Sequence, residues 1–96
     1  MVSFNDIRSR RAEILKAAAR HGAHNVRVFG SVVRGENTES SDIDMVVTME
    51  PDRSLFDRIE LMQELEDMLH VKVDVVNERA MSPIIRDEVL REGIEL

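Results

Sequence analysis

The 96-residue sequence contains no cysteine, tyrosine or tryptophan, and its only aromatic side chains are three phenylalanines. Without cysteine the chain forms no disulfide framework or thiolate metal site, and thiol chemistry is excluded. No apolar run approaches the length needed to span a membrane, and the N-terminus lacks the apolar core of a signal peptide. These absences predict a cytoplasmic protein.

Basic residues are also scarce over most of the chain, which has a formal net charge of −6. Residues 1–27 carry a net charge of +4, whereas residues 28–96 carry seven basic against seventeen acidic side chains, a net −10. An acidic chain is a poor candidate for a general nucleic-acid binder, whose affinity comes from neutralising phosphates. The basic N-terminal segment is interpreted as a solvated helix face, and a local contact with an anion stays open.

The length of 96 residues predicts one domain over residues 1–96, because separate cores rarely form in so short a chain. Hydrophobic periodicity and capping signals predict seven elements in the order α-β-α-β-α-β-α. They are a helix over about 4–21, strand Val26–Phe29, a short helix over Ser31–Arg34, strand Ile43–Thr48, a helix from Ser54 to about Leu69, strand Val71–Val76, and a helix from Pro83 to Gly93. The expected fold class is therefore α/β (α+β), with a small mixed three-stranded sheet flanked by helices.

The last helix has an apolar side that we expect to be buried. Its members are Ile84, Ile85, Val89 and Leu90.

The first two strands are joined by a segment that begins with Gly30-Ser31 and ends, ten residues later, with Asp42-Ile43-Asp44. Alternation along a strand places Asp42 and Asp44 on the same face, where two carboxylates repel unless a cation neutralises them. Mg²⁺ suits such a pair, because it prefers oxygen ligands and often combines carboxylates with substrate phosphates. Gly30 and Ser31 offer backbone N–H groups and a hydroxyl, and Arg34 follows one turn later. The segment therefore predicts a site for a nucleotide and a metal. The competing interpretation, a polar loop in which Ser41 and Asp42 only form a turn, leaves Asp44 unexplained.

A third carboxylate lies in the third strand, where Asp74 and Lys72 share the face opposite to Val73 and Val75. If this strand lies beside the second one, Asp74 joins Asp42 and Asp44, and three carboxylates form a site for two divalent cations. The alternative is that Asp74 pairs with Lys72 or with an arginine at an exposed sheet edge.

These motifs resemble the nucleotidyltransferase superfamily of the DNA polymerase β type, and most closely its minimal nucleotidyltransferases, the MNT proteins. The resemblance covers the chain from Val26 to Ile94. It implies that Gly30, Ser31, Arg34 and Ser41 contact ATP and that Asp42 and Asp44 bind Mg²⁺. It also implies that Asp74 completes the catalytic site and helps to activate the attacking hydroxyl.

The resemblance further implies a partner, because MNT proteins are typically encoded beside a HEPN-domain toxin. In such pairs the MNT antitoxin can transfer AMP from ATP to a tyrosine of the toxin. Two alternatives stay open: a non-catalytic antitoxin that neutralises its partner by forming a complex, and a nucleotide-binding subunit of a small-molecule nucleotidyltransferase. The sequence does not determine the base preference, the acceptor, or whether the protein forms a homo- or hetero-oligomer.

Overall fold

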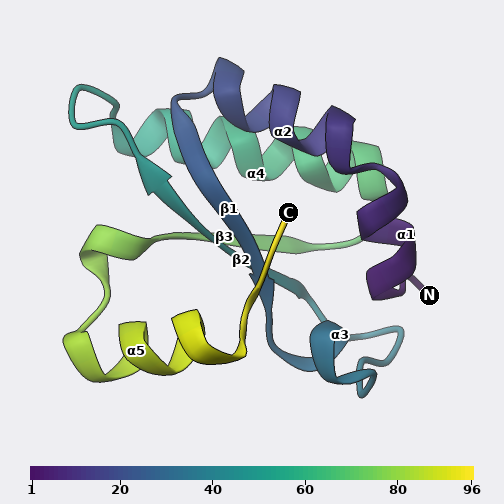
Figure 1. Cartoon of the computed structure of the whole chain (residues 1–96). Helices are drawn as coiled ribbons and strands as arrows, with labels where there is room; N and C mark the ends of the chain where they lie inside the picture. The colour runs from purple at the N-terminus through teal and green to yellow at the C-terminus, as the bar shows by residue number, and fades with distance from the viewer.

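The computed structural model describes residues 1–96 as a four-stranded sheet flanked by helices (Figure 1). The elements are α1 (Phe4–Ser9), α2 (Arg11–Arg20), β1 (Ala23–Phe29), α3 (Ser31–Arg34), β2 (Ile43–Met49), α4 (Leu55–Leu69), β3 (Val73–Asn77), the 3₁₀ helix η1 (Glu78–Ala80), α5 (Pro83–Glu92) and β4 (Ile94–Glu95). The predicted mixed α+β class is confirmed, and the short helix α3 has the bounds that the sequence indicated.

The sheet has the strand order β3-β2-β1-β4. β1 and β2 pair antiparallel, whereas β2 and β3 pair parallel, with α4 as the crossover helix between them. The prediction of three strands was one short. β4 pairs with β1 at only two positions, Arg27 with Glu95 and Val28 with Ile94. A two-residue strand shows no alternation in the sequence, so the periodicity of side chains could not reveal it.

The single N-terminal helix expected over 4–21 is two helices, which meet at Arg10. Arg10 leaves the helical conformation, with φ −105° and ψ 19°, and its guanidinium bonds to the carbonyl of Met68 and to Glu13. The apolar stripe continues across the break, because Ile7 and Ile14 are both fully buried. The periodicity of the sequence therefore could not show that the helix is interrupted.

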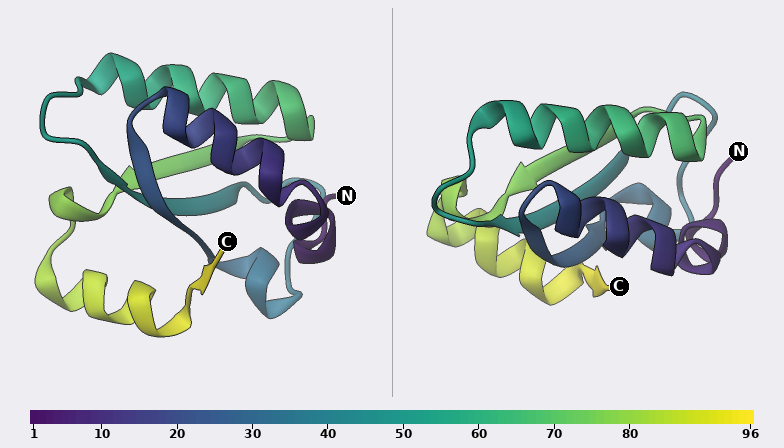
Figure 2. Two further views of the ribbon diagram at one scale, coloured as in Figure 1. Left: turned by 45° about the horizontal axis from the view of Figure 1, so that its top comes forward. Right: turned by 90° about the horizontal axis from the view of Figure 1, so that it is seen from above.

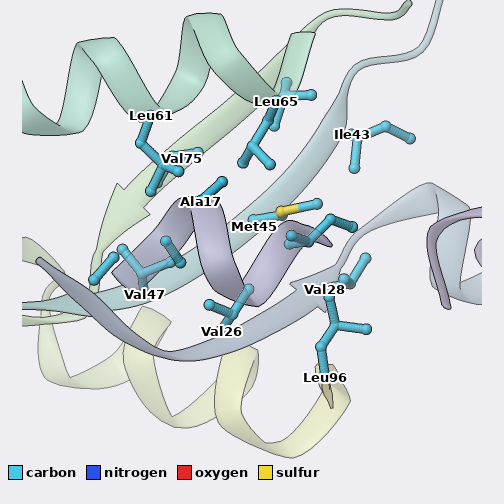
Figure 3. Packing of buried hydrophobic residues seen from close by; sticks show 14 of the residues in the cluster. Ala17, Val26, Val28, Ile43, Met45, Val47, Leu61, Leu65, Val75 and Leu96 are labelled. Carbon is cyan, nitrogen blue, oxygen red and sulfur yellow. The ribbon is translucent and has the colours of Figure 1, made fainter. Parts of the chain in front are cut away.

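α2 and α4 lie side by side over one face of the sheet (Figures 1 and 2). Beneath them, the buried side chains of β2 and β3 pack against α4 residues such as Leu61 and Leu65 (Figure 3). The strand residues of this core are Ala23, Val26, Val28, Ile43, Met45, Val47, Met49, Val73 and Val75. Because successive side chains of a strand alternate, Asp44 of β2 and Asp74 of β3 lie on the opposite face of the sheet, and Asp42 directly precedes β2. The core thus fixes which face carries the carboxylates.

α5 lies on the other side of the sheet from α2 and α4 (Figure 1). It begins as predicted, with the Ser82 side chain accepting a hydrogen bond from the Ile85 N–H and with Pro83 in the first turn. The predicted buried face was wrong in large part: Val89 is buried, but Ile84 is 82% exposed and Ile85 is 52% exposed. A helical apolar stripe shows that a face is apolar, but it does not show that another element of the same chain covers it.

None of the helices has both the length and the apolar character that crossing a membrane requires.

Candidate active site

Asp44, the second residue of β2, lies at the centre of the predicted site. Its Cα pairs with that of Phe29 on β1 and with that of Asp74 on β3, so three adjacent strands meet at this carboxylate. Asp44 is partly buried, whereas Asp74 is exposed. The parallel pairing of β2 and β3 therefore places two of the predicted carboxylates side by side, as the sequence indicated.

The electrostatics at Asp44 show how closely the acidic groups approach one another. Burial raises the pKa of the Asp44 carboxyl above its ordinary value, and the charges of Asp74 and then Asp42 raise this pKa further, while Arg34 opposes the shift. Burial and like charges both disfavour the ionised form of a carboxylic acid. An ionised Asp44 at neutral pH thus leaves a concentration of negative charge that a cation would relieve.

Gly30 lies directly against this carboxylate. Its backbone has φ +82°, in the region that favours glycine, and a Cβ placed on it would lie 2.5 Å from the Asp44 Oδ2 atom. Both observations require glycine at this position, since any larger residue would strain the backbone and displace the carboxylate. Ser31 follows as the first residue of α3. The motif begins with Gly30-Ser31 and ends with Asp42-x-Asp44, at opposite ends of the connection between β1 and β2. The contact between Gly30 and Asp44 makes these two ends neighbours in space.

Arg34 lies at the same site but is held by two carboxylates. Its Nε donates to Glu36 Oε2 at 3.0 Å, and its Nη1 donates to Glu92. These hydrogen bonds, first to Glu36 and then to Glu92, raise the pKa of Arg34. Sequence reasoning missed both acidic partners. Glu92, at the end of α5, follows Arg34 by 58 residues, and no local pattern links the two.

Ser41 takes part in a turn. Its hydroxyl oxygen accepts a hydrogen bond from the Thr38 N–H at 2.8 Å and lies 3.2 Å from the Thr38 hydroxyl. Ser41 also lines a cavity of about 300 Å³ next to Val2, Asn37 and His70. Ser41 therefore forms a turn, as the competing interpretation of the sequence expected. A contact of its hydroxyl with a nucleotide stays a prediction.

The three aspartates form none of the ion pairs of the structure, so Asp74 does not pair with Lys72 or with an arginine as the alternative required. No three His, Asp or Glu side chains lie close enough together to hold a metal ion by themselves. Mg²⁺ is commonly bound by one or two carboxylates together with waters and substrate phosphates, so it does not need such a cluster. The adjacent, unpaired carboxylates of Asp44 and Asp74 fit this mode of binding.

Comparison with known proteins agrees with this geometry. The family model described as "Polymerase beta, Nucleotidyltransferase" matches residues 12–96. The protein adenylyltransferase MntA of Thermococcus cleftensis is 44% identical over 75 residues, which are 78% of this chain and 76% of that protein.

Two solved structures resemble the fold. A candidate minimal nucleotidyltransferase is 48% identical, with a TM-score of 0.90 over 99% of this chain and 97% of the other. A chain of a toxin–antitoxin structure containing AMP-PNP is 28% identical, with a TM-score of 0.75 over 88% of this chain and 69% of the other. The chain therefore belongs to the polymerase beta nucleotidyltransferase family and, within it, to the minimal nucleotidyltransferases.

Proposed function

We propose that residues 1–96 act as one domain that transfers an adenylyl group from ATP to a hydroxyl of a partner protein. The observation that carries this proposal is the position of Asp44, which lies between Gly30 and Asp74 and has a pKa raised by burial and by the neighbouring carboxylates. A site that gathers unpaired acidic groups beside a close-approaching glycine suits a metal-bound triphosphate. The adenylyl group as the unit transferred is supported by the name of the relative MntA.

Each residue has a role in this proposal. Gly30 and Ser31 bind the β- and γ-phosphates, Arg34 adds a positive charge beside them, and Ser41 lies at the edge of the nucleotide site. Asp42, Asp44 and Asp74 would hold two Mg²⁺ ions in the full site. The charge of these ions would neutralise that of the phosphates. The acceptor oxygen forms a bond to the α-phosphorus, the bond from that phosphorus to the bridging oxygen breaks, and pyrophosphate leaves.

The exposure of Asp74 supports its role on the acceptor side of the reaction. Asp44 is partly buried between strands, whereas Asp74 can be reached by a hydroxyl that arrives from solvent. Asp74 would orient this hydroxyl for in-line attack and favour loss of its proton to solvent. Positioning and charge neutralisation account for most of the catalysis in transfers of this kind.

We also propose that the partner is a toxin of the HEPN type, which this chain neutralises as its antitoxin by modifying a tyrosine. The similar toxin–antitoxin structure with AMP-PNP supports a toxin as the partner and an adenine nucleotide as the substrate. The sequence supports an acceptor tyrosine on another molecule, because residues 1–96 contain no tyrosine.

The test is to measure the intact mass of the protein encoded beside this chain after incubation with this chain, ATP and Mg²⁺. We expect the mass to increase by one or more AMP units, and we expect no increase with Asp42→Asn or when Mg²⁺ is omitted. Glu39→Gln is the matched control, because it removes one exposed carboxylate from the same loop and should leave the reaction unchanged. A stable complex without any mass change would instead show an antitoxin that acts by binding, and AMP on a metabolite would show a small-molecule transferase.

A further inference from the structure

Three arginines line a cavity of about 320 Å³ at the ends of β2 and β3, away from the carboxylates. They are Arg53, before α4, Arg58, within α4, and Arg79, in the 3₁₀ helix η1 that follows β3. The cavity borders Met49, the last residue of β2, which is five residues beyond Asp44. At about 3.3 Å per residue, roughly 16 Å separate the two positions along the strand. The cavity is therefore a separate site.

Two of the three guanidinium groups have no acidic partner. Arg58 is partly buried, and its Nη1 donates to the carbonyl oxygen of Val75 at 2.7 Å, without any ion pair. The exposed side chain of Arg79 takes part in no hydrogen bond or ion pair, although its backbone N–H bonds to Asn77 Oδ1. Arg53 alone is paired, at 3.5 Å from both Glu50 and Asp57.

The balance of charge in the cavity is positive, although the chain as a whole has a net charge of −6. Three arginines face one lining carboxylate, that of Glu50, which also contacts His24 at 2.9 Å. The N-terminus of α4 adds little attraction for an anion, since the Asp57 side chain already accepts a hydrogen bond from the Ser54 N–H at 2.8 Å. The guanidinium groups are thus the features that would recognise a ligand.

We propose that this arginine cavity is a second ligand site, and that it binds a phosphate group. A guanidinium matches phosphate geometry, and a phosphate has enough oxygens to accept hydrogen bonds from Arg58 and Arg79 at once. A volume of about 320 Å³ is more than a bare phosphate fills and lies within the range of sites for small organic ligands. The phosphate is supplied either by a nucleotide or by a free inorganic anion.

The test is an NMR titration of the ¹⁵N-labelled full chain with inorganic pyrophosphate in the absence of divalent metal. We expect saturable shifts of the backbone amides of Leu55, Asn77 and Arg79, whereas those of Gly30 and Ser31 should shift only at higher pyrophosphate concentrations, because their site lacks Mg²⁺ under these conditions. Arg79→Gln should weaken binding at least tenfold, a loss of about 1.4 kcal/mol, because it removes one charge-assisted hydrogen bond to the phosphate. The fold should tolerate this change, since the Arg79 side chain has no partner in the chain.

Arg91→Gln is the matched control, because it removes the same charge from an exposed arginine of α5 that has no ion pair. Arg58→Gln is a second variant and should also weaken binding. Equal weakening by Arg91→Gln would overturn the proposal, because it would show attraction by net charge alone. Absence of saturable shifts, or shifts centred on Gly30 and Ser31, would overturn it as well.

Two further ligands distinguish the source of the phosphate. AMP that binds more tightly than pyrophosphate, with no binding of adenosine, would identify a nucleotide as the ligand. Equal or tighter binding of pyrophosphate would identify a free inorganic anion. Adenosine that binds as well as AMP would contradict the proposal, because recognition would then not depend on the phosphate. All of these outcomes are independent of whether the carboxylate site transfers AMP.

Discussion

At the scale of single residues, Gly30 combines two requirements that can be separated by experiment. Its backbone has φ +82°, and a Cβ at this position would come within 2.5 Å of the Asp44 carboxylate. Gly35 shares the first property, with φ +71°, but a Cβ there would meet no atom within 4 Å. The two glycines therefore form a matched pair, in which only one touches the proposed catalytic group.

We expect both Gly30→Ala and Gly35→Ala to destabilise the fold, by about 1–2 kcal/mol at Gly35, whose φ and ψ are left-handed α, and by up to about 3 kcal/mol at Gly30, whose ψ of −157° lies in a region essentially confined to glycine. Gly30→Ala should in addition reduce adenylyl transfer by about 100-fold, since displacement of a catalytic group by about 1 Å can have an effect of this size. Thermal unfolding and initial rates of transfer measure the two effects. Equal activity of the two variants would show that the position of Asp44 does not depend on Gly30.

Asp44 is expected to reduce the stability of the fold in which it functions. The pKa of its carboxyl is raised in the folded protein, so the folded state binds this proton more tightly than the unfolded chain does. The stability that the protonated form contributes is present below the ordinary pKa of 3.8 and is lost as the pH rises through the raised folded value. At neutral pH the ionised carboxylate is therefore unfavourable without a cation.

We expect Asp44→Asn to abolish transfer and yet raise the midpoint of thermal unfolding by a few degrees at pH 7, a gain limited because solvent screens the partly exposed group. The difference from the unchanged protein should shrink as the pH falls towards about 4. Mg²⁺ should stabilise the unchanged protein and have little effect on the variant. A variant less stable than the unchanged protein at pH 7 would show that Asp44 supports the fold.

The residues of the site differ in how far the sequence reveals them. Asp42, Asp44 and Asp74 could be placed on one face because alternation along a strand needs only local sequence, and Gly30 stands out as a glycine directly after a strand. Glu92 could not be identified in this way. Its contact with Arg34 depends on how α5 returns to the sheet, and the sequence contains no local signal for that return.

At the scale of elements, the sequence predicted the helices and strands that have a local signal, such as a helix cap or alternation of side chains. It missed the features that arise from contacts between residues far apart in the chain. α5 begins at Pro83 as expected because Ser82 and Pro83 form a helix start. The break between α1 and α2 depends on Arg10, which reaches the carbonyl of Met68, and β4 exists because it pairs with β1. Both features come from residues far apart in the chain, which periodicity does not detect.

The junction between α3 and α5 makes a prediction at this scale. Arg34 of α3 is bonded to Glu92, the last residue of α5, so a nucleotide that needs Arg34 must compete with this carboxylate. We expect Glu92→Gln to tighten ATP binding by no more than about fivefold, because solvent screens an exposed ion pair and makes its competition weak. Calorimetric titration with ATP and Mg²⁺ measures this affinity.

Glu95→Gln serves as the control, because it removes an exposed carboxylate from β4 that has no ion pair, and it should leave the affinity unchanged. The double variant Arg34→Gln/Glu92→Gln should lose the gain, since the guanidinium released by the first change is then absent. Weaker binding in Glu92→Gln would mean that Glu92 supports the nucleotide site and does not compete for Arg34.

At the scale of the whole molecule, the two faces of the sheet have different coverings. α2 and α4 cover one face and form the core with it, whereas α5 borders the face with the carboxylates (Figure 2). The first turn of α5 exposes Ile84 and Ile85. Asp74 on the carboxylate face is exposed. We expect the partner protein to supply part of the surface that positions the acceptor.

We therefore expect the partner to contact the start of α5. Ile84→Ser/Ile85→Ser should weaken the complex at least tenfold and slow adenylyl transfer to the protein, because an interface loses two apolar side chains that are exposed in the free chain. Unfolding should change little, since neither side chain lies in the core. Calorimetric titration of the partner measures the affinity.

Phe56→Ser is the control, because Phe56 is 73% exposed but belongs to α4, on the opposite side of the sheet. If Phe56→Ser weakened the complex and the α5 variant did not, the partner would contact the helical layer, and the acceptor would have to reach Asp74 around the edge of the sheet.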